Sequence, residues 1–258
     1  MSVPEDVRPQ PDVYHARTGH VLPKENSRVY SQLIKTANYA EANSMKINFK
    51  KTKVMLFNPC TSIDFMPELD IDNKELEVVE EMRLLGVIIR SDMKWRSNTD
   101  NMITKVNKKL WILRRLKYLG AKEIDLVDIY TKQIRSIVEL AVPAWHGAIT
   151  IAEQIDLERI QKCAAHIILG EDYDSYRKAL LRLDLKTLHN RREKLCLKFG
   201  KKSEKDLKFQ KWFKPASNQH YTRQEKFKYR SVFAKHSRFW KSPIAFLTRR
   251  LNEYHSRK

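Results

Sequence analysis

Apolar residues recur at spacings of three and four along most of the chain, and this periodicity predicts a mainly helical protein. The clearest such segment begins at Ser97 and ends at Gly120, a residue type that often follows the last turn of a helix. Its apolar positions are Ile103, Val106, Leu110, Leu113, Leu116 and Leu119. Ser97 and Asp100 have the spacing of a capping box, in which two side chains satisfy backbone groups at a helix start.

Other helices have weaker but similar patterns. We predict them over residues 29–44, 124–140, 150–170, 175–183 and 187–201. Pro143 follows the second of these and cannot continue a helix, because proline lacks the backbone N–H. Thr150 and Glu153 form a second capping box, and Gly170 is expected to end the helix that they begin.

Two short apolar runs lack helical spacing and predict strands. Residues 54–57 form the first run, which Asn58-Pro59 stops, and residues 84–89 form the second. We expect these two strands to pair in a small sheet, with one edge strand over residues 75–79. The predicted fold class is therefore mainly α, with a small β hairpin or sheet.

Composition divides the chain into four predicted segments. Residues 1–28 are polar and unpatterned, which is typical of a disordered or unrelated extension. Residues 29–96 contain the predicted strands, and residues 97–202 contain the main helices. In residues 203–258, Lys and Arg alternate with Phe, Trp and Tyr. We expect this tail to be only partly ordered, because its periodicity is weak.

Positive charge increases toward the C-terminus. The net charge is +19 and the pI is about 9.8. Residues 1–100 hold 14 basic and 15 acidic residues, whereas residues 201–258 hold 17 basic and 4 acidic residues. Such asymmetry predicts a polyanionic partner. Nucleic acid is the first candidate, and an anionic membrane surface is the alternative.

Cysteine usage and hydropathy bear on the compartment. Cys60, Cys163 and Cys196 are widely spaced and form no CxxC pair. Together with a polar N-terminus, this predicts reduced thiols in an intracellular protein, nuclear or cytoplasmic. No apolar run approaches the roughly 18 residues of a membrane span, so we expect none.

Several stretches resemble the reverse transcriptases of non-LTR (LINE-like) retrotransposons. Residues 43–57, NSMKINFKKTKVMLF, resemble the end of the palm. Residues 84–89, LLGVII, with SDMKW at 91–95, resemble the primer-grip hairpin. The resemblance implies that residues 29–96 are a palm-end and primer-grip remnant with α and β elements.

The later helices resemble the thumb of the same family. The matching stretches are residues 110–116, 134–139, 143–145, 160–164 and 191–195. Their order and spacing carry the resemblance, which covers residues 31–202. It implies that residues 97–202 form a helical thumb-like domain and that the partner is RNA, DNA or an RNA–DNA hybrid.

The chain departs from the family at its catalytic centre. An RNA-directed DNA polymerase holds Mg²⁺ through paired aspartates, and the family's aromatic-x-Asp-Asp motif should precede the first predicted helix. Unrelated sequence occupies that interval, and no Asp-Asp pair occurs anywhere. We therefore expect no catalytic residues, no metal site, no small-molecule cofactor and no polymerase activity from this chain alone.

Two groups near the predicted strands are candidate nucleic-acid contacts. Lys50, Lys51 and Lys53 lie in a loop before a strand and could contact phosphate, although a solvated turn explains them equally well. Gly86 lies within an apolar run, where glycine often allows close approach of another chain. By resemblance that chain is the primer strand, and the alternative is tight packing against a helix.

The first long helix supplies the remaining candidates, which lie largely away from its apolar positions. They are Lys105, Lys108, Lys109, Arg115 and Lys117. A thumb would lay such a face along duplex phosphates, whereas the plain alternative is an ordinary wet helix face. The tail's basic and aromatic residues suit single-stranded nucleic acid, a poorly folded remnant or a membrane-surface segment.

Other chemistry has little support in the sequence. Cys163 and His166 could share a metal, but an apolar-face cysteine is more often a core residue. We expect His146, beside Trp145, to serve packing. The predicted function is nucleic-acid binding by a truncated reverse transcriptase. The alternatives are a domesticated binding module, a non-functional remnant and a membrane-surface protein.

Overall fold

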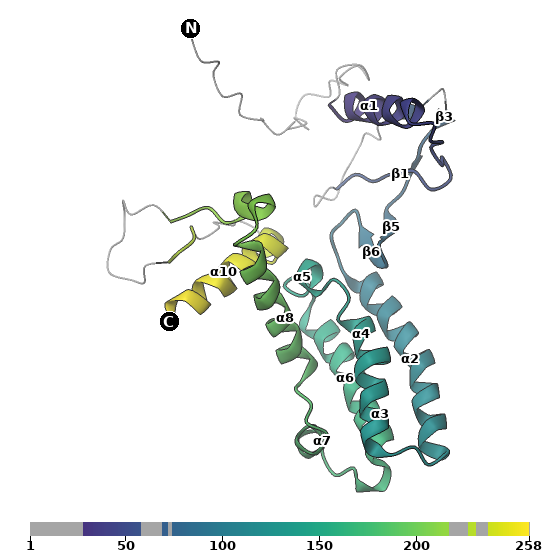
Figure 1. Ribbon diagram of the computed structural model, residues 1–258, viewed down its shortest axis with the longest axis vertical. Coiled ribbons are helices and arrows are strands. Elements are labelled where there is room, and N and C mark those ends of the chain that lie inside the picture. The colour runs from purple at the N-terminus through teal and green to yellow at the C-terminus, as the bar shows by residue number, and fades with distance from the viewer. Residues whose placement is uncertain (1–27, 58–68, 72–73, 217–226, 231–236, 258) are drawn as a thin grey trace. The chain divides into compact units, whose positions relative to one another are not determined.

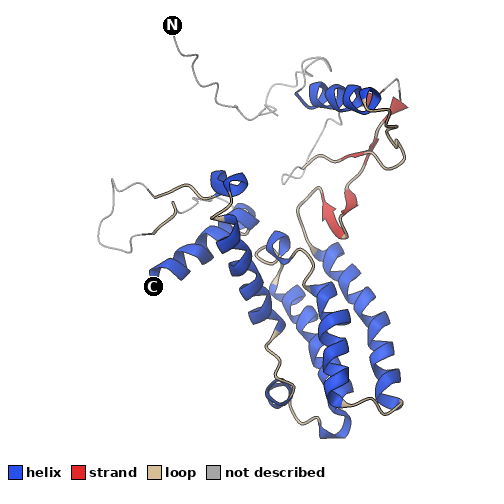
Figure 2. Cartoon of the chain, viewed as in Figure 1, coloured by secondary structure: helices blue, strands red, loops and turns tan. Residues whose placement is uncertain are grey.

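The computed structural model describes residues 28–57, 69–71, 74–216, 227–230 and 237–257. The described chain is mainly helical with a few short strands, which confirms the predicted fold class at that level (Figures 1 and 2). Its contacts divide the chain after Glu80 into two units, which we describe separately. Almost all of the predicted N-terminal extension lies outside the described residues.

The first unit combines one helix with short strands. Its elements are α1 (Arg28–Ala42), β1 (Lys53–Val54), β2 (Asp70–Ile71), β3 (Lys74–Glu75) and β4 (Glu77–Val78). Strand β1 pairs in parallel with β4, and β2 pairs antiparallel with β3. A small core of Leu69, Ile71 and Leu76 packs against the apolar side of α1.

The predicted pairing of residues 54–57 with residues 84–89 is wrong. Val54 pairs with Val78 instead, and the strand there is only two residues long. Residues 84–89 are not one strand either. They fold as a hairpin of β5 (Glu81–Leu84) and β6 (Val87–Arg90), which pair antiparallel. Leu85 and Gly86 both have positive φ at the turn, as a two-residue hairpin loop that follows strand twist requires.

The second unit continues from this hairpin into helices (Figure 1). They are α2 (Arg96–Tyr118), α3 (Glu123–Ile129), the π-helical η2 (Tyr130–Ile134), α4 (Arg135–Val138), α5 (Val142–Trp145), α6 (Ile151–Leu169), the short 3₁₀ turn η3 (Gly170–Asp172), α7 (Tyr176–Arg182), α8 (Leu188–Ser203), the 3₁₀ segment η4 (Leu207–Trp212), α9 (Ser237–Trp240) and α10 (Pro243–Ser256). All of the predicted helices are present, with α3, η2 and α4 forming one interrupted helix.

The core of the second unit lies where α2 packs beside α6 and the α3–α4 segment. Val106 and Leu113 on α2 are completely buried, as are Leu126 on α3 and Leu157 on α6. Val106 and Leu113 are among the apolar positions predicted from the sequence, whereas Leu126 and Leu157 were not predicted. Asn98 joins the hairpin to this core, because its Oδ1 accepts a hydrogen bond from Ile88 N at 3.1 Å.

The two predicted capping boxes have different outcomes. Thr150 caps α6: its Oγ1 accepts from Glu153 N at 3.2 Å, while Glu153 Oε2 accepts from Thr150 N at 2.7 Å. The Ser97–Asp100 box is wrong, because α2 begins at Arg96 and no side chain caps it. Asp100 instead forms an ion pair with Arg96, which a second carboxylate also holds.

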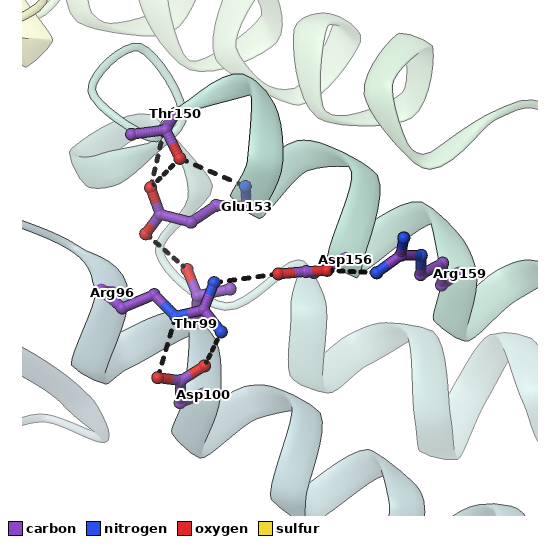
Figure 3. A network of polar contacts seen from close by, with 7 residues as sticks. All are labelled: Arg96, Thr99, Asp100, Thr150, Glu153, Asp156 and Arg159. Atoms are coloured by element: carbon purple, nitrogen blue, oxygen red, sulfur yellow. Dashed lines mark hydrogen bonds and ion pairs between the residues drawn. The ribbon is translucent and has the colours of Figure 1, made fainter.

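Polar contacts join the starts of α2 and α6 (Figure 3). Thr99 Oγ1 donates to Glu153 Oε1 at 3.3 Å, and both residues are buried. Arg96 pairs with Asp156 at 2.9 Å. Because hydrogen bonds are directional and buried donors are costly to leave unpaired, this network fixes how the two helices meet.

The described part of the tail belongs to the folded unit. Helix α10 packs on α5 and α8, and Phe246, Leu247 and Leu251 join the core. Asn252 pairs with Tyr229 through both backbone groups at 2.9 Å. Sequence periodicity did not single out α10, because its apolar stripe is short and interrupted by Arg249 and Arg250.

Candidate nucleic-acid interface

The side of α2 that faces away from the core carries alternating cations and aromatic rings. Lys108, Trp111, Arg115 and Tyr118 follow one another at spacings of three and four, which places them on one helix face. Trp111 is 65% exposed and Tyr118 is 79% exposed. We call these four residues the α2 outer stripe.

The cations of the stripe have no carboxylate partners in the described chain. Asp100 is the only acidic residue of α2, and no Asp or Glu occurs between residues 101 and 122. The Arg115 guanidinium packs over the Tyr118 ring at 5.4 Å. Lys108 has no ion-pair or hydrogen-bond partner among the described residues. Both charges are therefore available to an external anion.

Exposed rings beside free cations have a specific chemical use. Aromatic side chains stack on nucleobases, and neighbouring Lys and Arg hold the phosphates between them. Tryptophan and tyrosine at such high exposure have an energetic cost in water that a stacked partner would relieve. The outer stripe is therefore suited to a nucleic-acid strand whose bases are accessible.

The other predicted cations of α2 lie elsewhere. Lys105 and Lys109 are half-buried, and Lys109 Nζ donates to Gln133 Oε1 on η2 at 3.3 Å. Lys117 Nζ donates to the carbonyl oxygen of Ile168 at 2.7 Å, at the last turn of α6. The five predicted residues thus divide among three directions, and only Lys108 and Arg115 share the outer stripe.

The predicted lysines of the first unit also differ from one another. Lys50 and Lys51 are exposed in a turn that Asn48 organises, since Asn48 O accepts from both Lys51 N and Thr52 N at 3.0 Å. Lys53 instead forms an ion pair with Glu77 on β4, its direct neighbour in the parallel pair. Two of the three charges are therefore open to solvent.

Gly86 lies at the tip of the β5–β6 hairpin with φ of +90°. A Cβ atom at this position would come within 3.1 Å of the Leu140 side chain. Turn geometry therefore favours glycine here, and a larger residue would also press on Leu140. Beside it, Leu85 is 91% exposed, so the hairpin tip is apolar and open to solvent.

Trp111 and Tyr118 were not among the nucleic-acid contacts predicted from the sequence. Trp111 lies between Leu110 and Ile112, so its run of apolar neighbours hides its exposure. The helical repeat contained a signal for their exposure. Trp111 and Tyr118 do not fall at the spacing of three and four that joins Val106, Leu110 and Leu113, so they lie off the buried face of the helix.

The tail's aromatic residues divide between core and surface. Phe213 and Tyr229 are buried, whereas Phe239 and Trp240 are 54% and 44% exposed. Arg249 stacks over Trp240 at 3.9 Å. Of these four described rings, Phe239 and Trp240 are therefore the two that are open to a ligand.

His146 is buried in a polar chain. The Arg192 Nε–H faces His146 Nδ1 at 3.3 Å, and His146 Nε2 faces Glu193 Oε1 at 3.2 Å. Burial lowers the pKa of His146. Burial alone would raise the pKa of Glu193, but the His146 and Arg250 contacts lower it below its ordinary value. These polar contacts hold the end of α5 against α8.

Candidate metal ligands do not cluster in the described part of the chain. Nowhere in the described ranges do three His, Cys, Asp or Glu side chains lie together as metal ligands. Cys163 is half-buried, and its Sγ accepts a contact from Arg114 Nη2 at 3.7 Å.

Of the helices in the described ranges, none combines the length and apolarity needed to cross a membrane.

Comparison with known proteins adds no assignment. No protein-family model, curated protein or solved structure matches this chain.

Proposed function

We propose that this protein binds nucleic acid through the α2 outer stripe. The observation that carries the proposal is the alternation of two carboxylate-free cations with two highly exposed rings on one helix face. The net charge of +19 adds long-range attraction for a polyanion. The face opposite to the stripe is buried in the helical core, so the rings are presented on a rigid element.

We further propose that the chain derives from the C-terminal part of a non-LTR retrotransposon reverse transcriptase. The sequence resemblance supports this origin. So does the order of elements in the second unit, where a tight hairpin leads directly into a long helix, as a primer grip leads into a thumb. On this proposal the stripe corresponds to the thumb face that follows the primer–template, and the chain alone has no polymerase activity.

The test is binding of the purified chain to a labelled primer–template with a single-stranded overhang, measured by fluorescence anisotropy. Between about 50 and 200 mM salt, affinity should fall on the order of 10²-fold if several phosphates are contacted. The double variant Lys108→Gln/Arg115→Gln should lower the salt slope by about 2, since each lost phosphate contact removes about 1. Trp111→Ala should weaken binding to the overhang by about 1–3 kcal/mol with little change in slope.

Matched controls keep the charge change constant. Lys132 and Lys178 are exposed but form ion pairs with Asp128 and Asp174. Lys132→Gln/Lys178→Gln removes the same two charges without touching the stripe. If this control lowers affinity and slope as much as the stripe variant does, the binding is non-specific attraction to a basic protein. Equal or tighter binding to anionic vesicles would instead favour a membrane surface.

Polymerase activity is tested separately on the same substrate. We expect no nucleotide incorporation with Mg²⁺ present. Incorporation that survives in the Lys108→Gln/Arg115→Gln variant at saturating substrate would overturn the proposed truncated origin.

A cooperative melting transition of the purified chain would count against a remnant that no longer folds.

A further inference from the structure

A pocket of about 350 Å³ opens between α2 and α6, next to the outer stripe, since Arg114 follows Trp111 by three residues and precedes Tyr118 by four. This volume is at the lower end of the range for small-molecule sites. The pocket is lined by Arg114, Arg159, Lys162, Cys163, His166, Ile167 and Tyr173. None of these side chains is acidic, so the pocket combines four basic groups with a thiol, an aliphatic side chain and a phenol.

Two of the permanent charges at this pocket have no carboxylate partner in the described chain. The only contact of the Arg114 guanidinium there is the Cys163 thiol, with Nη2 and Sγ 3.7 Å apart. Lys162 is exposed on α6 and has no ion-pair partner within the described ranges. Arg159, by contrast, is paired with Asp156 at 2.8 Å. The pocket therefore offers two uncompensated positive charges, which match a dianion.

The remaining lining is apolar or aromatic. The His166 and Tyr173 rings lie 4.9 Å apart, and Ile167 lies beside them on α6. The Tyr173 hydroxyl is buried and has no hydrogen-bond partner among the described residues. The two rings therefore give the pocket a flat aromatic wall, whereas the Tyr173 hydroxyl itself is closed to a ligand.

We infer that this pocket binds a phosphate monoester carried on a flat, partly apolar body, as in a nucleoside 5′-monophosphate or the 5′-phosphorylated end of a strand. A monoester carries nearly two negative charges at neutral pH, whereas an internal phosphodiester carries one. The two free cations therefore favour a terminal phosphate. Arg114 can meet two phosphate oxygens through its planar guanidinium. The free-nucleotide form of this inference does not depend on the proposed function.

Cys163 provides a local reporter of occupancy. Cys163 is half-buried while Cys196 is completely buried. The Cys60→Ser substitution removes the third thiol from the assay. A neutral aromatic disulfide, 4,4′-dithiodipyridine, is used to label the thiol, because its reaction with Cys163 is not driven by attraction to the cations. Adenosine 5′-monophosphate should slow the labelling of Cys163 in a saturable way, and adenosine should not. The Cys163→Ser variant gives the background rate.

Variants then test the assigned cations. Arg114→Gln and Lys162→Gln should each raise the half-protecting concentration of the monophosphate by about tenfold, as expected for one lost charge-assisted contact. Lys178→Gln, on α7, is the matched charge control and should leave it unchanged. Equal protection by adenosine and its monophosphate, or unchanged protection in Arg114→Gln, would overturn the inference.

A second arm separates a free nucleotide from a strand end. Oligonucleotides that differ only in a 5′-phosphate or a 5′-hydroxyl are compared in the same protection assay. Protection by the 5′-phosphorylated strand alone, abolished by Arg114→Gln but retained in Lys108→Gln/Arg115→Gln, assigns the pocket to strand ends. Protection by the monophosphate without any by the phosphorylated strand assigns it to free nucleotides. Unchanged strand binding in the stripe variant with monophosphate protection intact would overturn the proposed function alone. Weakened strand binding in that variant without monophosphate or strand-end protection would overturn the pocket inference alone.

Discussion

The Lys117 ammonium on α2 donates a hydrogen bond to the carbonyl oxygen of Ile168, 2.7 Å away at the end of α6. Carbonyls in the last turn of a helix have no partner within the helix, and a cation near them also interacts favourably with the helix dipole. One of the lysines expected to contact phosphate thus caps a neighbouring helix.

Lys117→Met should consequently lower the free energy of unfolding by about 0.5–1 kcal/mol, through loss of this cap. It should change nucleic-acid affinity far less than Lys108→Gln does. Chemical denaturation and anisotropy on the same sample measure both effects. A Lys117→Met protein of unchanged stability that loses binding as strongly as Lys108→Gln would return Lys117 to the interface.

Gly86→Ala should destabilise the second unit by more than Gly120→Ala. Both glycines have positive φ, +90° and +83°, so each substitution costs about 1 kcal/mol of backbone strain. Only at Gly86 would the new Cβ also press on Leu140, at 3.1 Å, since nothing lies within 4 Å at Gly120. Thermal melts of the two variants give the difference, and equal losses would mean that the Leu140 contact is unimportant.

Gly147→Ala should destabilise the packing of α10 on α5. A Cβ at residue 147 would lie 2.7 Å from Phe246 Cγ, closer than side chains tolerate. Overpacking of this kind costs about 1–3 kcal/mol. In a Phe246→Ala background the same substitution should cost less, because Cγ and Cδ2 are removed and only the Cβ of residue 246, at 2.8 Å, remains close. Additive losses in this double-mutant cycle would contradict the direct contact between the tail helix and α5.

Stability should fall as the pH is lowered through the ordinary titration range of histidine. Burial lowers the pKa of His146 below its ordinary value of 6.5, despite the nearby Glu193 carboxylate. The unfolded chain therefore takes up a proton below about pH 6.5 that the folded chain resists, and unfolding becomes easier as pH falls. Arg192 and His189 on α8 face the same ring and oppose its protonation.

His146→Gln tests this pH dependence, because glutamine keeps an acceptor for Arg192 but does not titrate. The loss of stability of the natural protein between pH 7 and pH 5.5 should exceed that of the variant, as measured by denaturant midpoints. If the denaturant midpoints of the two proteins fall in parallel across this range, groups other than His146 cause the loss of stability.

Local signals in the sequence determined most of the helices. Thr150 and Glu153 mark the start of α6, and Gly170 marks its end, because capping depends on neighbours within a few residues. The same locality explains why the apolar spacing identified the buried side of α2. The mainly helical class and the basic character follow from composition and periodicity alone.

Tertiary structure decided what local patterns leave open. Val54 could pair with any nearby strand, and Leu84 through Ile89 could be one strand or a hairpin, since strand pairing depends on distant residues. Whether a cation is free depends on the neighbouring helix. Lys117 and Lys108 look alike in the sequence, but the end of α6 holds the first, while the second stays beside Trp111 in solvent. The sequence thus determined which residues are basic, and the packing of α6 on α2 decided which of them can meet a ligand.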